Sequence, residues 1–546
     1  MGKVLIIGCG ISGLSSAISL AEKGIKSVLV SPFPSERAQS VMAAGGINAV
    51  DDCPDGADSV EKHILDTIKG GSFIAGKEAV TGLCKSAASI IDQLERMGMV
   101  FTKDSEGRYA KRAFGGQSFK RTCFSGASTG KQIVTSLIME CRKYESDGLI
   151  ERMMWTDFHS GLIRDGRIYG VLLFSEATRE LFPVYADAVI VATGGQNTLF
   201  GKTTGSTTCD GYTAGKLFTQ GAELKNLEFI QYHPTTIETV HKRMLISEAA
   251  RGEGGRLFCN KDGDRFYFME EKFGPKGNLM PRDVVSSCMH KLGTQVYLDV
   301  SFLKKDIIMN RLYEVYDVCK KYRNIDITRE PIPVEPSIHF FMGGLAVKNN
   351  HETNIEGLYA VGECASIYHG ANRLGGNSLL SAIYGGQVAA SSIKESYSAA
   401  THSNADFTEY IKVENDKFKS AGRNSSKFPV AYIRDMVAED MNRNLGIVRD
   451  EKSLEEGIKN MDYYMDIASK LNYDSNVLPY FNYSIPGILN LGKAILVSAL
   501  SRKESRGSHL RSDYPDMDDE YKAASIVSYN DGRFDIRYDK EGSYER

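Results

Sequence analysis

Three glycines near the start of the chain have the spacing of a nucleotide-binding loop. Gly8, Gly10 and Gly13 follow an apolar run and precede apolar residues at helical spacing. In such a strand–loop–helix unit, the first glycine permits a tight turn, the second lets the backbone approach a pyrophosphate, and the third lets helix and strand pack closely. The helix N-terminus also presents positive potential to the phosphates. We therefore predict a dinucleotide site that includes Ile11 and Ser12.

One part of the dinucleotide pattern is missing. The second expected strand, residues 27–30, should be followed by an acidic residue that hydrogen-bonds a ribose hydroxyl. The sequence has Ser31 and Pro32 there instead. Because the Ser31 hydroxyl can donate or accept a hydrogen bond, we keep Ser31 among the nucleotide contacts. The glycine pattern alone does not separate FAD from NAD.

Glu248 and Arg251 form a second group of residues that could do chemistry. They are three positions apart, so both side chains lie on one face if this stretch is helical. The pair then has two interpretations, a structural ion pair or two members of a proton relay. Taken without their neighbours, the two residues favour the structural pair.

The strands that must position these residues recur far apart in the chain. Residues 3–7, 188–192 and 357–361 are apolar runs that each end in glycine or a Thr-Gly pair. Such runs are typical of strands buried on both faces of a parallel sheet. We expect them to join residues 27–30 in one nucleotide-binding domain that long insertions interrupt.

The rest of the chain divides by charge and periodicity. A charged segment interrupts the nucleotide-binding domain, an amphipathic helical pattern follows it, and the last residues are acidic and then strand-like. The helical pattern is clear at Leu454, Ile458 and Met461, which share one face of a helix. These features predict four units: a nucleotide-binding domain at 1–235 and 336–404, an inserted domain at 236–335, a helical domain at 405–515 and a tail at 516–546.

Composition argues against several classes of protein. The 546 residues carry a net charge of −3, which gives no basic surplus for nucleic acid. The ten cysteines have no CxxC or cluster-ligand spacing, so we expect reduced thiols and place any iron–sulfur cluster on another chain. No export signal and no apolar run of about 18 residues is visible. We expect a cytoplasmic protein, free to attach to the inner face of the cell membrane through partner subunits.

Three further segments resemble a family of flavoproteins. They are residues 41–49 (VMAAGGINA), residues 232–235 (YHPT) with 247–255 (SEAARGEGG), and residues 369–380 (HGANRLGGNSLL). Each is similar to a motif of the superfamily that contains succinate dehydrogenase, fumarate reductase and L-aspartate oxidase. Their order and spacing hold over nearly the whole chain. The resemblance implies an α/β fold: a Rossmann-type FAD-binding domain, an inserted α+β capping domain, a C-terminal helical domain and a small tail.

Other segments are similar to one branch of this superfamily. Residues 112–116 (RAFGG), 121–124 (RTCF) and 129–130 (TG) resemble the fumarate reductase and succinate dehydrogenase branch. Residues 506–509 (RGSH) do so too, although aspartate oxidases carry a similar sequence. The resemblance thus implies a flavoprotein subunit that interconverts fumarate and succinate. Such a subunit takes part in electron transport, for example in anaerobic respiration.

Fumarate reduction needs a hydride from flavin N5 at one alkene carbon and a proton at its neighbour. Negative charge builds on a substrate carboxylate as the hydride arrives, so cationic or hydrogen-bonding groups must hold both carboxylates. The resemblance implies that His233, His339 and Arg373 do so, helped by the hydroxyl of Ser247, where the family usually has threonine. A guanidinium suits this role because it binds a carboxylate through two parallel hydrogen bonds.

The resemblance also implies the source of the proton. Arg282 is expected to be the general acid, and the proton is expected to reach it from solvent through Arg251 and Glu248. Arginine is an unusual acid because its pKa exceeds about 12. It can serve if its proton is replaced at once and the developing carbanion is strongly basic.

The resemblance implies a set of FAD contacts besides the glycine loop and Ser31. The acidic side chain of Glu363 suits a ribityl or ribose hydroxyl. The expected contacts are Ser40, Ala44, Gly45, Gly46, Ala192, Thr193, Gly194, Asp210, Glu363, Asn377, Ser378 and Leu379.

One position departs from the family pattern. Most respiratory members attach FAD covalently to a histidine two residues after the position of Arg37, and this chain has Gln39 there. A glutamine amide cannot form that bond, so we expect FAD to be bound noncovalently. Noncovalent binding tends to lower the flavin potential, which suits fumarate reduction or an oxidase better than succinate oxidation.

The sequence leaves other functions open. L-aspartate oxidase has the same fold, also lacks the covalent histidine, and reduces oxygen or fumarate while it makes iminoaspartate. A reductase of another unsaturated carboxylic acid is a further alternative. A noncatalytic flavoprotein scaffold is the alternative of another class, although a scaffold has no need of so many ionisable side chains. The leading interpretation implies a dicarboxylate substrate and an iron–sulfur partner subunit.

Overall fold

The computed structural model describes residues 3–50, 57–126, 128–396, 405–421, 430–469 and 483–540. Nine cysteines lie in these ranges and all are free thiols, whereas Cys53 lies outside the described residues. None of the described helices combines the length and the apolar character needed to cross a bilayer.

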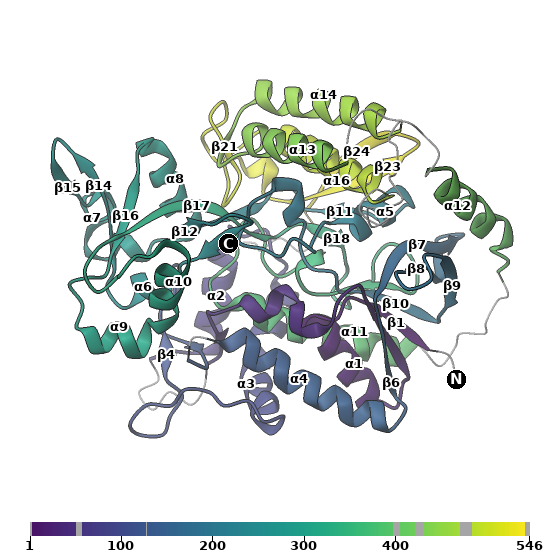
Figure 1. Ribbon diagram of the computed structural model, residues 1–546, viewed down its shortest axis with the longest axis horizontal. Coiled ribbons are helices and arrows are strands. Elements are labelled where there is room, and N and C mark those ends of the chain that lie inside the picture. Colours follow the sequence, from purple (N-terminus) through teal and green to yellow (C-terminus); the bar gives the residue numbers. More distant parts are fainter. Residues whose placement is uncertain are drawn as a thin grey trace.

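A sheet of five parallel strands organises the first core (Figure 1). The expected strands at the four apolar runs are confirmed, and each residue of β1, β2 and β10 is buried, as a sheet covered on both faces requires. In spatial order the strands are β19 (Leu358–Ala360), β10 (Ala188–Val191), β1 (Val4–Ile7), β2 (Ser27–Ser31) and β6 (Ile150–Met154).

Helices and a small sheet cover this parallel sheet. Helices α1, α4 and α11 pack together and α3 packs on α11, while an antiparallel sheet of three strands packs against β2 and β10. The helices are α1 (Ile11–Glu22), α2 (Val60–Gly70), α3 (Lys77–Arg96), α4 (Thr129–Ser146) and α11 (Asn377–Ser396). The strands of the covering sheet are β7 (Thr156–Arg164), β8 (Arg167–Ser175) and β9 (Leu181–Tyr185). A second small sheet contains β3 (Ile47–Asn48), β4 (Lys111–Arg112) and β5 (Thr122–Cys123).

A second core lies at the left of Figure 1. Its apolar cluster contains side chains from Ile237 to Val334. Six antiparallel strands form its sheet in the order β13 (Arg243–Leu245), β12 (Ile230–Glu238), β17 (Ile332–Phe341), β16 (Val296–Asp299), β14 (Arg256–Lys261) and β15 (Asp264–Phe266). Its helices are α6 (Ala249–Gly252), α7 (Phe268–Phe273), α8 (Arg282–Leu292), α9 (Lys305–Arg311) and α10 (Tyr313–Arg323).

The strands β12 and β17 join the two cores. Both extend past the expected boundaries of the inserted domain at 236 and 335, and they pair with each other through a register that shifts twice. Each shift marks an irregularity of the β-bulge type, which locally re-aims side chains. His233 lies at the second shift, so the chain bends where the expected site begins.

The helical pattern expected after residue 405 is confirmed. Helices α13, α14 and α16 pack as a layer at the top of Figure 1, and Leu454 and Met461 are buried on one face of α14. The bounds are α12 (Thr408–Ala421), α13 (Val430–Asn444), α14 (Glu451–Ala468) and α16 (Ile485–Ser501). Two short strands, β21 (Val448–Arg449) and β22 (Leu510–Arg511), pair in parallel beside them.

The strand-like tail forms a hairpin that completes a sheet of the first core. Its strands β23 (Ala524–Asn530) and β24 (Arg533–Asp539) pair with each other, and β23 also pairs with β11 (Leu224–Lys225). The order of this sheet is β20 (Ala365–Ser366), β18 (Gly344–Ala346), β11, β23 and β24. Helix α5 (Tyr212–Thr219) precedes β11 and packs on α16. The tail is therefore part of the main body of the fold.

A fully buried ion network ties these parts together. Arg502, at the end of α16, donates through Nε to Glu228 at 2.6 Å and through Nη1 to Glu504 at 2.8 Å, and none of the three side chains is exposed. The second oxygen of Glu228 accepts from the hydroxyl of Ser525 in β23 at 2.7 Å. One carboxylate thus links the first core, the helical layer and the tail.

This linkage predicts a large loss of stability for Glu228→Ala. The substitution leaves Arg502 buried with only part of its compensating charge, which should cost about 3–5 kcal/mol. The midpoint of chemical denaturation measures the change. The control is Glu223→Ala, which removes an ion pair with the half-exposed Arg537 and should cost about 0–1 kcal/mol. Equal shifts for both variants would contradict the assignment of Glu228 as a structural link.

Candidate active site

A cavity between the two cores collects most of the expected site residues. It is lined by the β1–α1 loop, the segment around residue 45 and the end of β10 from the first core, and by β13 and α10 from the second. The expected residues that line it are Gly8, Gly10, Ile11, Ser12, Ser31, Ser40, Ala44, Gly45, Gly46, Ala192, Thr193, Gly194, Asp210, His233, Ser247, Glu248, Arg282, His339, Glu363, Arg373, Ser378 and Leu379. Gly13, Arg251 and Asn377 do not line it.

The geometry of the glycine loop suits a pyrophosphate. Gly8 has a φ of +111°, and a Cβ there would lie 2.3 Å from the carbonyl oxygen of Ala192. A Cβ on Gly13 would lie 2.0 Å from the carbonyl oxygen of Gly8, so Gly13 serves helix packing. Ser40 Oγ accepts from the backbone N–H of Ile11 at 3.3 Å, but neither a side chain at Gly10 nor an acidic residue in the first turn caps helix α1. Its positive end therefore faces the cavity, as phosphate binding needs.

Two buried carboxyl groups line the cavity among the expected FAD contacts. Glu363 accepts a hydrogen bond from the backbone N–H of Phe341 at 3.1 Å, and burial raises its pKa to about 7. Asp210 accepts from the backbone N–H of Tyr212 at 2.9 Å, which supports the turn into α5. In the described part of the chain, no group of three or more His, Cys, Asp or Glu side chains is arranged to hold a metal ion.

Asn377 has a different position from the one expected. Its side-chain oxygen accepts from Asn48 Nδ2 at 2.8 Å and lies 3.0 Å from His63 Nε2, and its Nδ2 donates to Thr67 Oγ1 at 2.9 Å. These contacts anchor the start of α11 to α2 and β3. The amide supports the cavity wall from behind.

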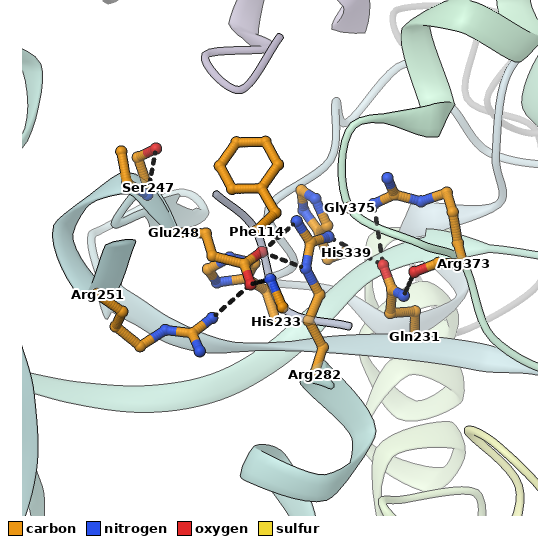
Figure 2. Close-up of polar contacts among 12 residues, drawn as sticks. Phe114, Gln231, His233, Ser247, Glu248, Arg251, Arg282, His339, Arg373 and Gly375 are labelled. Carbon is orange, nitrogen blue, oxygen red and sulfur yellow. Dashed lines mark hydrogen bonds and ion pairs between the residues drawn. The ribbon is translucent and has the colours of Figure 1, made fainter. Parts of the chain in front are cut away.

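Two histidines and two arginines meet at one end of the cavity (Figure 2). The rings of His233 and His339 are 5.2 Å apart between centroids. Burial, and then the charge of Arg282, lower the pKa of both histidines well below the usual value, so both are neutral at pH 7. Burial, and then Arg282, also lower the pKa of Arg373 well below its usual value. The arginines therefore carry the positive charge at this end of the cavity.

Some polar atoms at this end of the cavity are buried without a partner. His233 Nε2 and Arg373 Nε have no hydrogen-bond partner among the described residues. Buried polar atoms are normally satisfied by protein or ordered water, so such atoms in a cavity lining indicate a ligand site. Nitrogen donors beside cationic groups favour an anion.

One carboxylate, Glu248, binds two of the arginines. It accepts from Arg282 Nε at 2.9 Å and Nη2 at 2.8 Å, and its other oxygen lies 3.2 Å from Arg251 Nη2. The backbone N–H of Gly115 donates to it at 2.7 Å. Burial alone would raise the pKa of Glu248, but the charges of Arg282 and Arg251 outweigh burial and lower the pKa to about 2.

The helical stretch predicted around Glu248 and Arg251 is present as the short helix α6, and the two side chains meet as the spacing required (Figure 2). The outer end of the expected path differs, because the side chain of Arg251 is fully buried. Its Nη1 donates to the backbone carbonyl of Asn278 at 2.6 Å. Arg251 therefore contacts the segment around Asn278 and has no direct access to solvent.

Ser247 lies at the edge of this cluster. Its hydroxyl accepts from the backbone N–H of Ala249 at 3.3 Å, so it helps to begin α6. In Figure 2 it lies beyond Glu248, away from the Arg373 end of the cluster. Ser247 lines the cavity, and its hydroxyl hydrogen is available to a ligand.

Sequence reasoning missed Gln231, which connects the arginines. Its side-chain oxygen accepts from both Arg282 Nη1 at 3.0 Å and Arg373 Nη2 at 2.9 Å. Its Nε2 donates to Asn372 Oδ1 at 2.7 Å and to the carbonyl oxygen of Arg373 at 2.8 Å. The only signal in the sequence was its place directly before the Tyr232-His233 motif.

Gln39, the departure from the family pattern, also lines the cavity. Its Nε2 lies 3.4 Å from the carbonyl oxygen of Thr204, and its Oε1 is buried without a hydrogen-bond partner among the described residues. The hydroxyl of Thr204 lies 2.8 Å from His339 Nδ1. Thr204 therefore connects the segment that carries Gln39 with the histidine end of the cavity.

Two family models match the chain, one over its N-terminal part and one over its C-terminal part. The model of the FAD binding domain family matches residues 3–379, and that of the fumarate reductase flavoprotein C-terminal family matches residues 434–542. The chain therefore contains an FAD-binding domain.

Relatives cover almost the full length of the chain. The succinate dehydrogenase flavoprotein subunit of Bacillus subtilis (strain 168) is 36% identical, with 96% of this chain and 94% of that protein covered. One of the subunits of the fumarate reductase (CoM/CoB) of Methanothermobacter marburgensis is 34% identical, with 96% of each chain covered. A solved mutant of E. coli quinol fumarate reductase FrdA has a TM-score of 0.92 at 29% identity, over 98% of this chain and 96% of that chain. The chain belongs to the family of succinate dehydrogenase and fumarate reductase flavoproteins.

Proposed function

We propose that this protein is an FAD-dependent oxidoreductase that interconverts fumarate and succinate. The observation that carries the proposal is the ring of cationic and neutral nitrogen donors at one end of a cavity whose other end suits a dinucleotide. A small dianion satisfies the unpartnered nitrogens of His233 and Arg373 and offsets the positive charge. The names of the relatives agree with such a substrate.

In this proposal, the residues act on the substrate carboxylates and on its proton supply. FAD, when bound, supplies the hydride that reduces one alkene carbon. His233, His339 and Arg373 hold the two carboxylates, and Ser247 adds a hydroxyl donor. Because these groups sit in a buried cavity, their stabilisation of developing negative charge is stronger than in water.

Arg282 donates the proton to the neighbouring carbon. The ion pair of Arg282 with Glu248 supports this role, since two hydrogen bonds fix the guanidinium and a carboxylate is in place to return a proton to it. Arg251 is the next donor along the path. Its burial means that proton entry from solvent needs a further step past the segment around Asn278.

The charge of the site argues against L-aspartate as the substrate. L-Aspartate carries an ammonium group in addition to two carboxylates. Glu248, the carboxylate at this end of the cavity, already pairs with Arg282 and Arg251, so an ammonium would meet an excess of positive charge. Fumarate and succinate carry no such group.

We propose that FAD is bound noncovalently, because Gln39 occupies the position at which a histidine forms the covalent bond in most respiratory relatives. Noncovalent FAD tends to have a lower potential, and we therefore favour fumarate reduction as the direction. Electrons then come from an iron–sulfur partner subunit, since the dispersed cysteines of this chain supply no cluster site. The cytoplasmic location stays a prediction.

The proposed activity predicts that the FAD-loaded protein oxidises a reduced viologen dye on addition of fumarate. Loss of the dye colour measures turnover, and L-aspartate with oxygen is the matched alternative, followed by peroxide formation. Peroxide from L-aspartate without turnover of fumarate would replace this proposal with an aspartate oxidase.

The proposed general acid predicts a kinetic defect without loss of cofactor. Arg282→Ala should retain FAD but reduce fumarate turnover by about 10²–10⁴-fold, the usual contribution of a general acid. The viologen assay measures turnover and flavin absorbance measures FAD content. Arg265→Ala is the control, since Arg265 pairs with Asp299 in the same core and does not line the cavity. Near-normal turnover of Arg282→Ala would remove Arg282 as the acid.

Noncovalent attachment predicts that acid denaturation releases all of the yellow flavin into the supernatant. The measurement is flavin absorbance of the supernatant and of the washed precipitate. Flavin colour that stays with the precipitated chain would show a covalent bond to another residue.

A further inference from the structure

One hydrogen bond joins the neighbours of the two arginines that face each other across the site. Asn372 Nδ2 donates to Asp283 Oδ1 at 2.7 Å. Asp283 follows Arg282 directly in the sequence and Asn372 directly precedes Arg373. Neither Asp283 nor Asn372 lines the cavity, so neither contacts the substrate in the function proposed above.

The hydrogen bond also crosses the boundary between the two cores. Asp283 lies in the first turn of α8, and Val285 and Met289 of this helix belong to the apolar cluster of the second core. Asn372 lies in the loop before α11, which belongs to the first core. The hydrogen bond therefore fixes α8, which carries Arg282, relative to the loop that carries Arg373.

The side-chain oxygen of Asn372 is connected to the guanidinium groups through Gln231. Asn372 Oδ1 accepts from Gln231 Nε2 at 2.7 Å and from the backbone N–H of Arg373 at 3.0 Å. Since Gln231 Oε1 accepts from both Arg282 and Arg373, the hydrogen bonds form a closed path. The path runs from Asp283 through Asn372 and Gln231 to the two guanidiniums, and Arg282 returns to Asp283 through the chain itself.

The orientation of each amide in this path follows from its neighbours. Asn372 must direct its NH₂ group at Asp283, because only the carboxylate accepts, and its oxygen at the two donors. With Asn372 fixed, Gln231 must direct its oxygen at the two arginines. Without the carboxylate of Asp283, the NH₂ group of Asn372 loses its acceptor and a buried donor is left unpaired, which weakens the hold on Asn372 and, through it, on Gln231.

The guanidiniums of Arg282 and Arg373 repel each other. Hydrogen-bond acceptors are therefore needed to hold them at a fixed separation. The charge of Arg282 lowers the pKa of Arg373 in addition to the effect of burial. Glu248 holds Arg282, and the oxygen of Gln231 is an acceptor that Arg282 and Arg373 share. A rotation of Gln231 frees the guanidinium of Arg373 to move away from Arg282, and a displacement of about 1 Å can cost about 10²-fold in rate.

We propose that Asp283 is a positioning residue, whose hydrogen bond to Asn372 sets the separation and orientation of Arg282 and Arg373 through Gln231. Asp283 thereby sets both the affinity of the site for dicarboxylates and the alignment of the general acid. The inference rests on the proposed function, because it assigns Asp283 to the same site.

The test exchanges the two groups. Asn372→Asp places two carboxylates in contact, so fumarate turnover should fall about 10²-fold. The double variant Asp283→Asn with Asn372→Asp restores the hydrogen bond with donor and acceptor reversed. In it the amide at position 283 donates to the carboxylate at position 372, which still accepts from Gln231 and from the backbone N–H of Arg373. Its turnover should recover to within about 10-fold of the parent enzyme.

Malonate, a dicarboxylate with no alkene, provides a readout apart from turnover. Its Kd, measured by the change in flavin absorbance of the FAD-loaded protein, should weaken about 10-fold in Asn372→Asp and recover in the exchanged pair, in parallel with turnover. The control Asp299→Asn alters a buried carboxylate of the second core that accepts from Arg265 and Ser301. It should leave both quantities within about 2-fold of the parent, as expected for distant, independent sites.

The outcomes separate this inference from the proposed function. If the parent protein reduces fumarate and binds malonate but Asn372→Asp changes neither, or the exchange brings no recovery, the positioning role is wrong and the function stands. If the parent protein does neither, both fall. If Asn372→Asp loses FAD, the test uses alanine variants instead. These are Asp283→Ala, Asn372→Ala and the double variant that carries both substitutions. Non-additive losses then support the coupling through Asn372, and additive losses overturn it.

Discussion

The whole site depends on the cost of gathering positive charge in a buried cavity. Arg251, Arg282 and Arg373 are all buried, and the carboxylate of Glu248 pairs with two of them. That carboxylate neutralises part of the positive charge. The side-chain oxygen of Gln231 accepts a hydrogen bond from each of the guanidiniums of Arg282 and Arg373. Burial of charge is tolerated only with such partners. In the function proposed above, the remaining positive charge favours a dianion.

The two-core architecture follows from this constraint. No single helix or strand could present three arginines and two histidines to one point, since the side chains of one element do not all face the same way and the arginine charges would repel one another. The fold takes them instead from β12, α6, α8, β17 and the loop before α11. The second core brings Arg282 to the first, and the paired strands β12 and β17 hold the two together. The relative position of the two cores therefore sets the distances between these side chains.

Much of the frame could be predicted from the sequence, because it rests on periodic patterns. Buried parallel strands give continuous apolar runs, as at β1 and β10. A side chain at Gly8 or Gly13 would clash with the backbone, so both positions need glycine and the motif has a fixed spacing. The Glu248–Arg251 contact followed from helical spacing. The polar links among Gln231, Asn372 and Asp283 could not be predicted, because two amides and an acid at these positions follow no periodic pattern in the sequence. The burial of Arg251 depends on a distant loop, and Asn377 supports the cavity wall from outside it.

The pairing of the tail with β11 has a consequence for biosynthesis. Leu224 pairs with Val527, so on the ribosome this strand waits for roughly 300 further residues, or about 15–60 s at the usual speed of about 5–20 residues per second. During that time the edge of β11 that pairs with β23 stays open to other chains. The interval in which β11 is prone to non-native pairing therefore lasts until the segment that forms β23 has been made.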